Sequence, residues 1–187
     1  MVMKSSGKGP HDTHYSPSSI LREVEVEFVN PFLSALHATL KSMTMGQTTA
    51  QKGSLSLIKA DIISGDTLIF LRVDGALKGL VVLSLQEEFA KKLVSTFLLG
   101  VPIIEMDEMA KNSLVEFSLR IAELAHTKLV KKGYPANVSF HINYNNPIQF
   151  TREHQFLVIP LNTVHGQFNV FFNVAKTDLA EKETPEN

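Results

Sequence analysis

The sequence contains no cysteine, and this absence removes several kinds of site at once. A chain without thiols forms no disulfide, holds no zinc through thiolate ligands and has no cysteine nucleophile. The absence also fits a reducing compartment, where disulfides rarely form. Aromatic residues are few as well, at 8% of the chain. Thiol chemistry of every kind is therefore excluded.

An excess of charge and long apolar runs are also lacking. The formal net charge is −1, which provides no basic field to attract nucleic acid. The longest apolar runs, such as residues 79–85, have the length of a strand and not of a membrane span. Residues 4–19 are polar throughout, unlike a signal peptide. We therefore predict a cytoplasmic protein that binds neither nucleic acid nor a membrane.

The composition that is present is that of an ordinary globular domain. The chain has 187 residues, of which 44% are apolar, enough for one domain with a substantial core. Residues 1–22 are rich in small and polar residues and are expected to form a flexible tail. Residues 176–187 are charged, contain proline and are expected to form a second tail. The domain is therefore expected at residues 23–175.

The first half of the domain predicts one helix, three strands and a short helix. Apolar side chains recur at helical spacing after Pro31 and before Gly46. Runs typical of strands follow at residues 54–63, 67–73 and 77–85, with glycine and aspartate at the two turns between them. An amphipathic helix is expected at residues 86–98. The short connections favour antiparallel pairing.

The second half repeats this plan. A long helix is expected at residues 107–132, stopped by Gly133 and Pro135, with strands at residues 137–144, 155–161 and 167–174. Residues 79–85 and 166–172 each follow a turn and end a three-strand set, which suggests an internal duplication, although ordinary alternation of helices and strands explains the same pattern. The predicted fold class is α+β, with two layers and helices packed on a mainly antiparallel sheet.

The long helix has an apolar side and an unusual outer side. At 100° per residue, the side expected to be buried holds Ala110, Leu114, Phe117, Ile121, Leu124, Ala125 and Lys128. The outer side holds Asn112, Glu116, Leu119, Glu123, His126 and Val130. Arg120 follows Glu116 by four residues, so a simple intrahelical ion pair explains these two charges. The mixture of acidic and apolar side chains on one outer face indicates, alternatively, a surface that binds another protein.

Five segments of the chain match a known pattern in their order and spacing. They are residues 24–32, 76–84, 107–129, 157–161 and 166–168. Within the long helix, Glu116 stands at an acidic position of that pattern, and Ala122 and Leu129 stand at its recurring small and apolar positions. Over roughly residues 23–174 the chain thus resembles the CheX group of the CheC/CheX/FliY chemotaxis phosphatases. The resemblance implies a duplicated CheC-like fold and a homodimer formed through the sheets.

The resemblance also implies a specific activity. Such proteins hydrolyse the aspartyl phosphate of a CheY-like response regulator by inserting a helix that carries Glu-x-x-Asn. The glutamate engages the active-site lysine of the regulator, and the asparagine positions the attacking water. The regulator carries the phosphoaspartate and the Mg²⁺, so the phosphatase needs no cofactor of its own. Orienting a water molecule is then the main catalytic task, because an acyl phosphate is already reactive.

The chain departs from this pattern where the chemistry occurs. Glu116 is present as the catalytic residue, but Leu119 stands where the asparagine is expected. A leucine side chain neither donates nor accepts a hydrogen bond, so it does not orient water. Glu123 replaces a small residue that usually follows Ala122. Asn112 lies one turn before Glu116 on the same face, but its side chain starts from a different turn, which argues against an equivalent reach.

The histidines do not predict a metal site. His11 and His14 lie in the N-terminal tail, and the other five are scattered over separate elements: His37, His126, His141, His154 and His165. Glu123 and His126 have a spacing found in carboxylate-bridged metal helices, but the chain has no second such pair.

The predicted function is that of a CheX-like protein of chemotaxis or two-component signalling that binds a CheY-like receiver, with hydrolysis of the receiver's aspartyl phosphate left open. Glu116 is assigned to catalysis, and Asn112, Leu119, Arg120 and Glu123 to partner binding. Two alternatives stay open. One is a catalytically inactive interaction module in which Leu119 helps to dock some partner, and the other is a structural subunit of an oligomer.

Overall fold

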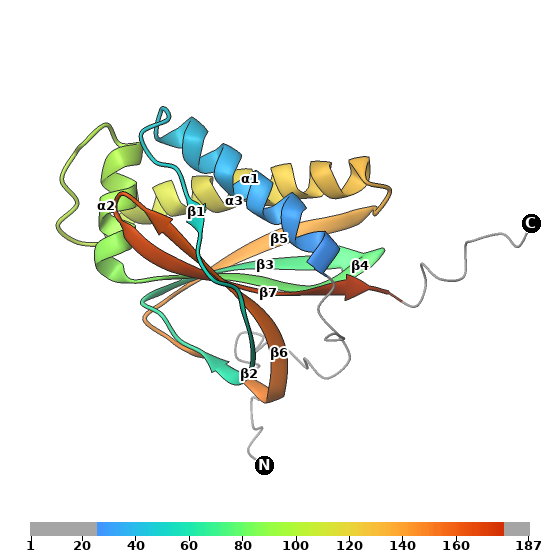
Figure 1. Ribbon diagram of the computed structural model, residues 1–187. Helices are drawn as coiled ribbons and strands as arrows, with labels where there is room; N and C mark the ends of the chain where they lie inside the picture. Colours follow the sequence, from blue (N-terminus) through green and yellow to red (C-terminus); the bar gives the residue numbers. More distant parts are fainter. Residues whose placement is uncertain (1–25, 178–187) are drawn as a thin grey trace, which may run out of the picture.

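The computed structural model describes residues 26–177, so the predicted N-terminal tail and the C-terminal tail beyond residue 177 lie outside the described residues. In chain order the elements are η2 (Val26–Phe28), α1 (Val29–Met43), β1 (Gln51–Lys52), β2 (Ser56–Ile63), β3 (Thr67–Gly75), β4 (Leu77–Leu85), α2 (Glu87–Phe97), α3 (Glu108–Lys131), β5 (Ala136–Tyr144), β6 (Ile148–Thr163) and β7 (Gly166–Lys176). The helices α1, α2 and α3 pack on a strongly curled sheet (Figure 1). The α+β prediction is confirmed.

The sheet has seven strands, and every pair in it is antiparallel. Its order is β1-β6-β7-β4-β3-β5, with β2 also paired to β6. β1 and β2 lie one after the other along the long β6, since Lys52 is opposite Leu161 and Ser56 is opposite Val158. At the other end β5 pairs only with β3 among the described strands, so it forms an edge of the sheet.

The strand order supports the internal duplication. Suppose that β5, β6 and β7 correspond to β2, β3 and β4. When each strand is replaced by its counterpart in the other half, the order β2-β6-β7-β4-β3-β5 becomes the same order read from the opposite end. The first strand of each half therefore pairs with the opposite half. At the centre, Leu83 lies opposite Val170. Each stands four residues after the glycine that begins its segment, Gly79 or Gly166. This near-two-fold arrangement favours duplication over chance alternation.

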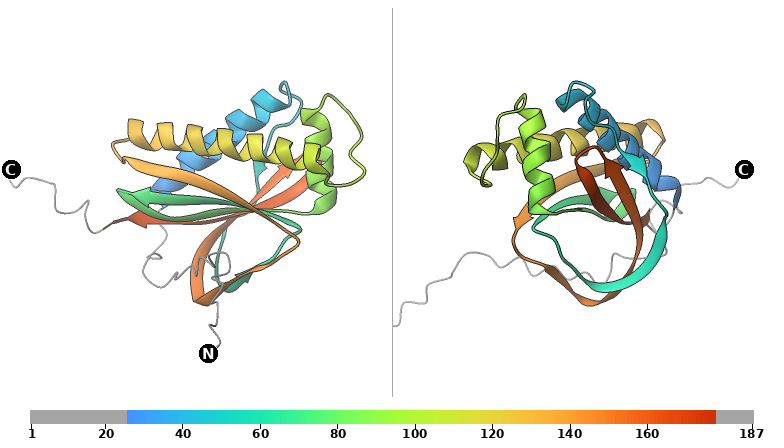
Figure 2. Two further views of the ribbon diagram at one scale, coloured as in Figure 1. Left: turned by 180° about the vertical axis from the view of Figure 1, so that it is seen from behind. Right: turned by 60° about the vertical axis from the view of Figure 1, so that its left-hand side comes forward.

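The three helices cover one face of the sheet and form the main core with it (Figure 2). Strand residues of alternating position supply the sheet side of this core, for example Ile69, Leu71 and Leu83. On the helices, the largest fully buried side chains include Phe117 and Leu40. Among residues 26–177, no helix is long and apolar enough to span a membrane.

A second, smaller core lies on the face of the sheet that the helices leave uncovered. β6 and β2 curl away beneath the sheet (Figure 1), and their side chains meet the residues of β3 and β4 that point away from the helices. The cluster consists of Ile63, Leu68, Phe70, Val82, Phe150 and Phe156, all buried. The sheet therefore carries apolar packing on both faces, and the second face explains why β3 and β4 are apolar almost without interruption.

For the predicted elements, the boundaries hold to within a few residues except at β6. β6 was expected at residues 155–161 but runs from Ile148 to Thr163. Its first half, which contains a polar stretch, forms the curled part that pairs with β2. A strand whose outer face meets solvent accepts polar residues, so hydropathy alone did not reveal it. The two-residue β1 was not predicted either.

Candidate functional site

The candidate site is built on α3, whose ends are defined by local chemistry. The Asp107 side chain accepts a hydrogen bond from the backbone N–H of Ala110 (2.8 Å) and caps the first turn. Gly133, with φ of +85°, ends the helix in a left-handed conformation that favours glycine. The helix lies across the sheet beside α1, with its outer face open (Figure 2).

The buried side of α3 differs from the predicted stripe at two positions. Leu124 is 36% exposed and Lys128 is only half-buried, whereas Ser118, Ala122 and Leu129 are buried. The physical reason is that α3 packs against both α1 and β5, so its buried arc is turned relative to the apolar stripe. The prediction that Leu124 belongs to the core is wrong, and Leu124 instead joins the outer face.

His126 also lies elsewhere than predicted. It was assigned to the outer face but is half-buried. Its Nδ1–H donates a hydrogen bond to the carbonyl oxygen of Ala136 (2.8 Å) on β5. The ring therefore holds α3 against the edge of the sheet. Within residues 26–177, no group of three or more histidine, aspartate or glutamate side chains is placed to hold a metal ion.

The remaining predicted site residues are exposed, and four of them share one groove. A groove of about 460 Å³ lies between α3 and α1. Its α3 side consists of Glu116, Leu119, Arg120, Glu123, Leu124 and Thr127, and its α1 side consists of Ala38, Thr39 and Ser42. Asn112 is exposed but does not line the groove. Sequence reasoning missed the α1 residues, because nothing in the sequence showed which side of α1 faces α3.

The two central charges of the groove pair with each other. Arg120 Nε donates a hydrogen bond to Glu116 Oε1 at 2.6 Å, and both side chains are about half exposed. This is the intrahelical ion pair that the spacing indicated. An exposed pair of this kind contributes only about 0.5 kcal/mol, so a partner cation can replace Arg120 at little cost.

No amide in the groove replaces the missing asparagine. Leu119 is 39% exposed beside Glu116. The hydroxyl of Thr127 donates to the backbone carbonyl of Glu123 (2.9 Å). Thr39 Oγ1 has no hydrogen-bond partner within the described part of the chain, but it is buried at the floor of the groove, away from solvent. The groove therefore offers two carboxylates, one guanidinium, hydroxyl groups and an apolar surface, and no amide stands among its lining residues in the described part of the chain.

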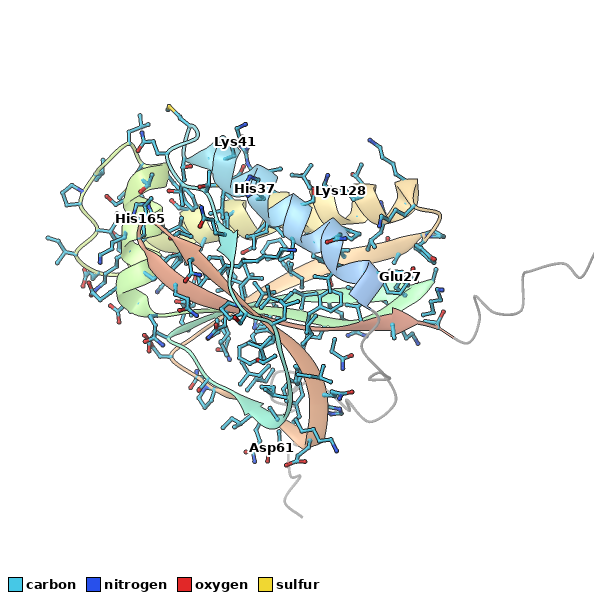
Figure 3. All side chains as sticks on the ribbon, in the orientation of Figure 1. Glu27, His37, Lys41, Asp61, Lys128 and His165 are labelled. Carbon is cyan, nitrogen blue, oxygen red and sulfur yellow. The ribbon has the colours of Figure 1, made fainter. Side chains whose placement is uncertain are left out.

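His165 has a clearly shifted pKa. It lies at the turn between β6 and β7 beside α2 (Figure 3), where Nε2 is 2.9 Å from Thr48 Oγ1 and 3.0 Å from Thr96 Oγ1. Burial lowers its pKa, and the positive charge of Lys92 lowers it further. The neutral ring therefore links the loop after α1, the end of α2 and the β6–β7 turn.

A pH dependence of stability follows from this shift. The unfolded chain takes up a proton at His165 near pH 6.5, roughly the ordinary histidine value, and the folded chain does so only at lower pH. The contribution to stability is complete above the unfolded pKa and is lost as the pH falls through the folded pKa. Chemical denaturation between about pH 7 and pH 5 should show a smaller loss of stability in His165→Gln than in the wild type. An equal loss in both proteins would assign the acid sensitivity to other groups.

Comparisons with known proteins identify the fold. No protein-family model matches the chain, and no curated protein sequence matches it. A solved CheC-like superfamily protein from Shewanella sp. PV-4 is 22% identical, with a TM-score of 0.69 over 81% of this chain and 99% of that one. The chemotaxis protein CheX from Desulfovibrio desulfuricans is 19% identical, with a TM-score of 0.68 over 81% and 99%. The chain has the CheC-like fold.

A third structure with this fold contains a partner. It is the CheX–CheY–BeF₃–Mg²⁺ complex from Borrelia burgdorferi, whose matching chain is 18% identical, with a TM-score of 0.62 over 81% of this chain and 100% of that one. At such identities the likeness establishes the CheC-like fold and not the activity. The fold that the sequence resemblance implied is confirmed.

Proposed function

We propose that this protein binds the phosphorylated form of a CheY-like response regulator through the α1–α3 groove and dephosphorylates it slowly at most. The observation that carries the proposal is the position of Leu119. It lies in the groove with Glu116, at the place where the CheX pattern has its water-positioning asparagine. The groove thus retains the residue assigned to binding the lysine of the regulator and lacks the residue assigned to the water.

The exposed surface supports a protein partner. Leu119 and Leu124 are exposed at 39% and 36%, and they flank the Glu116–Arg120 pair. An apolar patch with charges beside it is a common composition for the centre and rim of a protein interface. Complementary contacts on the partner would be an apolar side chain for the leucines and a cation for Glu116.

Two further parts of the proposal concern the metal and the assembly. The Mg²⁺ required for phosphate chemistry would come with the regulator, as the CheX pattern implies. A homodimer is proposed as well. The outer edge of β5 supports it, because β5 pairs only with β3 among the described strands and presents unpaired backbone groups.

Analytical sedimentation tests binding and assembly together. The protein is mixed with a CheY-like receiver, once alone and once with beryllofluoride, which mimics the phosphate, and Mg²⁺. The dissociation constant should fall on activation of the receiver, and Glu116→Ala should weaken binding by about tenfold. Glu153→Ala, which removes an exposed carboxylate from β6, is the matched control and should bind like the wild type.

Each alternative gives a different result. A module for some other partner ignores the receiver in both states, and so does a structural subunit. If Glu116→Ala and Glu153→Ala bind equally well, the α1–α3 groove is not the binding site. A monomeric mass for the protein alone at all concentrations removes the homodimer from the proposal.

A further inference from the structure

The face of the sheet away from the helices carries a pocket that is separate from the α1–α3 groove. Paired residues of neighbouring strands point to the same face of a sheet. Phe70 is paired with His141 and Arg72 with Ser139 across β3 and β5, and Leu80 of β4 is paired with Arg72. Since Phe70 belongs to the small core below the sheet, all of these side chains lie on the lower face.

The start of β6 closes this area into a pocket. Ile148, Gln149 and Phe150 form its opposite wall, and the pocket, which is partly open to solvent, has a volume of about 470 Å³. Volumes of roughly 300–1,000 Å³ are usual for small-molecule sites. The pocket is formed by strands on both sides, so its walls are held by backbone hydrogen bonds between strands and by the small core beneath.

The lining combines an apolar floor with a polar rim. Phe70 and Phe150 are almost fully buried, at 6% and 8% exposed, and Leu80 is half-buried beside them. The ring of Phe70 stacks on that of His141, with centroids 6.3 Å apart.

The rim consists of Ser139, Asn143, Gln149 and Arg72. Among the ten described lining residues, Arg72 carries a permanent positive charge. Arg72 already takes part in another interaction, but its guanidinium has five N–H donors, so it can also bind an anionic group. The pocket therefore suits a molecule whose apolar part is flat or aliphatic and whose polar end accepts hydrogen bonds and bears a negative charge.

We propose that this pocket binds a small amphiphile, with its apolar body on Phe70, Leu80 and Phe150 and its anionic head group at Ser139, Asn143 and Arg72. The proposal does not depend on the receiver-binding function, because the pocket and the α1–α3 groove share no residue. A ligand here would contact β5 and β3 directly.

Fluorescence titration of the full chain with two related probes tests the proposal. Anilinonaphthalene sulfonate carries an anionic head on an aromatic body, and N-phenylnaphthylamine has the same rings without the sulfonate. One molecule of the sulfonate should bind per chain. Ser139→Trp fills the pocket from an exposed position on an edge strand, and it should weaken both probes by about tenfold. Ser56→Trp, exposed on β2 and outside the lining, should leave both affinities unchanged.

Arg72→Gln tests recognition of the anionic head group separately from binding of the apolar body. It should weaken the sulfonate by about fivefold or more and leave the neutral probe within about twofold. Circular dichroism melts of each variant establish that it folds. Equal probe affinities in Ser139→Trp, Ser56→Trp and the wild type would overturn the site, and an equal loss of both probes in Arg72→Gln would overturn the anionic head group. If the bound probe is released when the protein dimerises at high concentration, a second copy of the chain covers the pocket, and the small-amphiphile proposal is wrong.

Discussion

Replacing Leu119 with asparagine is expected to raise the rate of dephosphorylation of a CheY-like receiver by about tenfold or more. The side chain at this position is exposed in the α1–α3 groove and stands three residues after Glu116 on the same face of α3. An amide here can hold a water molecule by its oxygen and direct it at the phosphorus, whereas leucine cannot. The decay of receiver phosphate with substoichiometric protein measures the effect.

Leu119→Ala is the matched control for this change. It removes the same apolar contact without adding an amide, so its rate should stay at or below that of the wild type. The fold should tolerate both substitutions, because the position is 39% exposed. If Leu119→Asn binds the receiver normally and gains no activity, the proposal that the missing amide limits turnover is wrong. If neither variant binds the receiver, Leu119 is essential for docking, and binding must be tested by Glu116→Ala alone.

Changing Gly79 to alanine is expected to destabilise the protein by about 4 kcal/mol. Gly79 lies within β4 at the centre of the sheet, opposite Val174 of β7, and has a φ of +152°. A Cβ atom there would clash with the carbonyl oxygen of Asn173 and lie 2.7 Å from the Cα of Val174. Thermal denaturation measures the effect, and the melting temperature should fall by about 10 °C or more.

Gly133→Ala separates the clash from the conformational cost. Gly133 also has a positive φ (+85°), at the end of α3, but a Cβ atom would meet nothing within 4 Å. Its substitution should cost only about 1 kcal/mol. Similar melting temperatures for the two variants would show that β7 moves aside at Gly79. The close contact between β4 and β7 would then not be a fixed feature of the sheet.

The sequence revealed most of the fold because the local signals agreed with one another. Gly133 and Pro135 marked the end of α3, and turn residues separated β2, β3 and β4. The first half of β6 was missed because its polar residues lie on a curled strand with an exposed face. No local signal showed that β5 pairs with β3 and that β2 pairs with β6. Pairing between distant segments depends on the packing of the whole sheet.

For the candidate site, too, the sequence predicted some features and only the structure revealed the others. Glu116, Leu119, Arg120 and Glu123 were placed together from helical spacing, because residues three and four apart share a helix face. Helical spacing also indicated the Glu116–Arg120 pair. It placed Leu124 and His126 wrongly, because the neighbours of a helix decide which arc is buried, and here α1 and β5 both contact α3. Leu124 therefore gives the groove a second leucine, and His126 lies against β5.

By itself, the sequence determined most of the elements and the presence of leucine at residue 119, where the CheX pattern has an amide, since each of these depends on local chemistry or on residue identity. Only the tertiary structure decided that Ala38, Thr39 and Ser42 face Glu116 across a groove and that the lower face of the sheet encloses a pocket. These features join residues far apart in the chain. Their contacts arise from packing of separate elements, which no local pattern encodes.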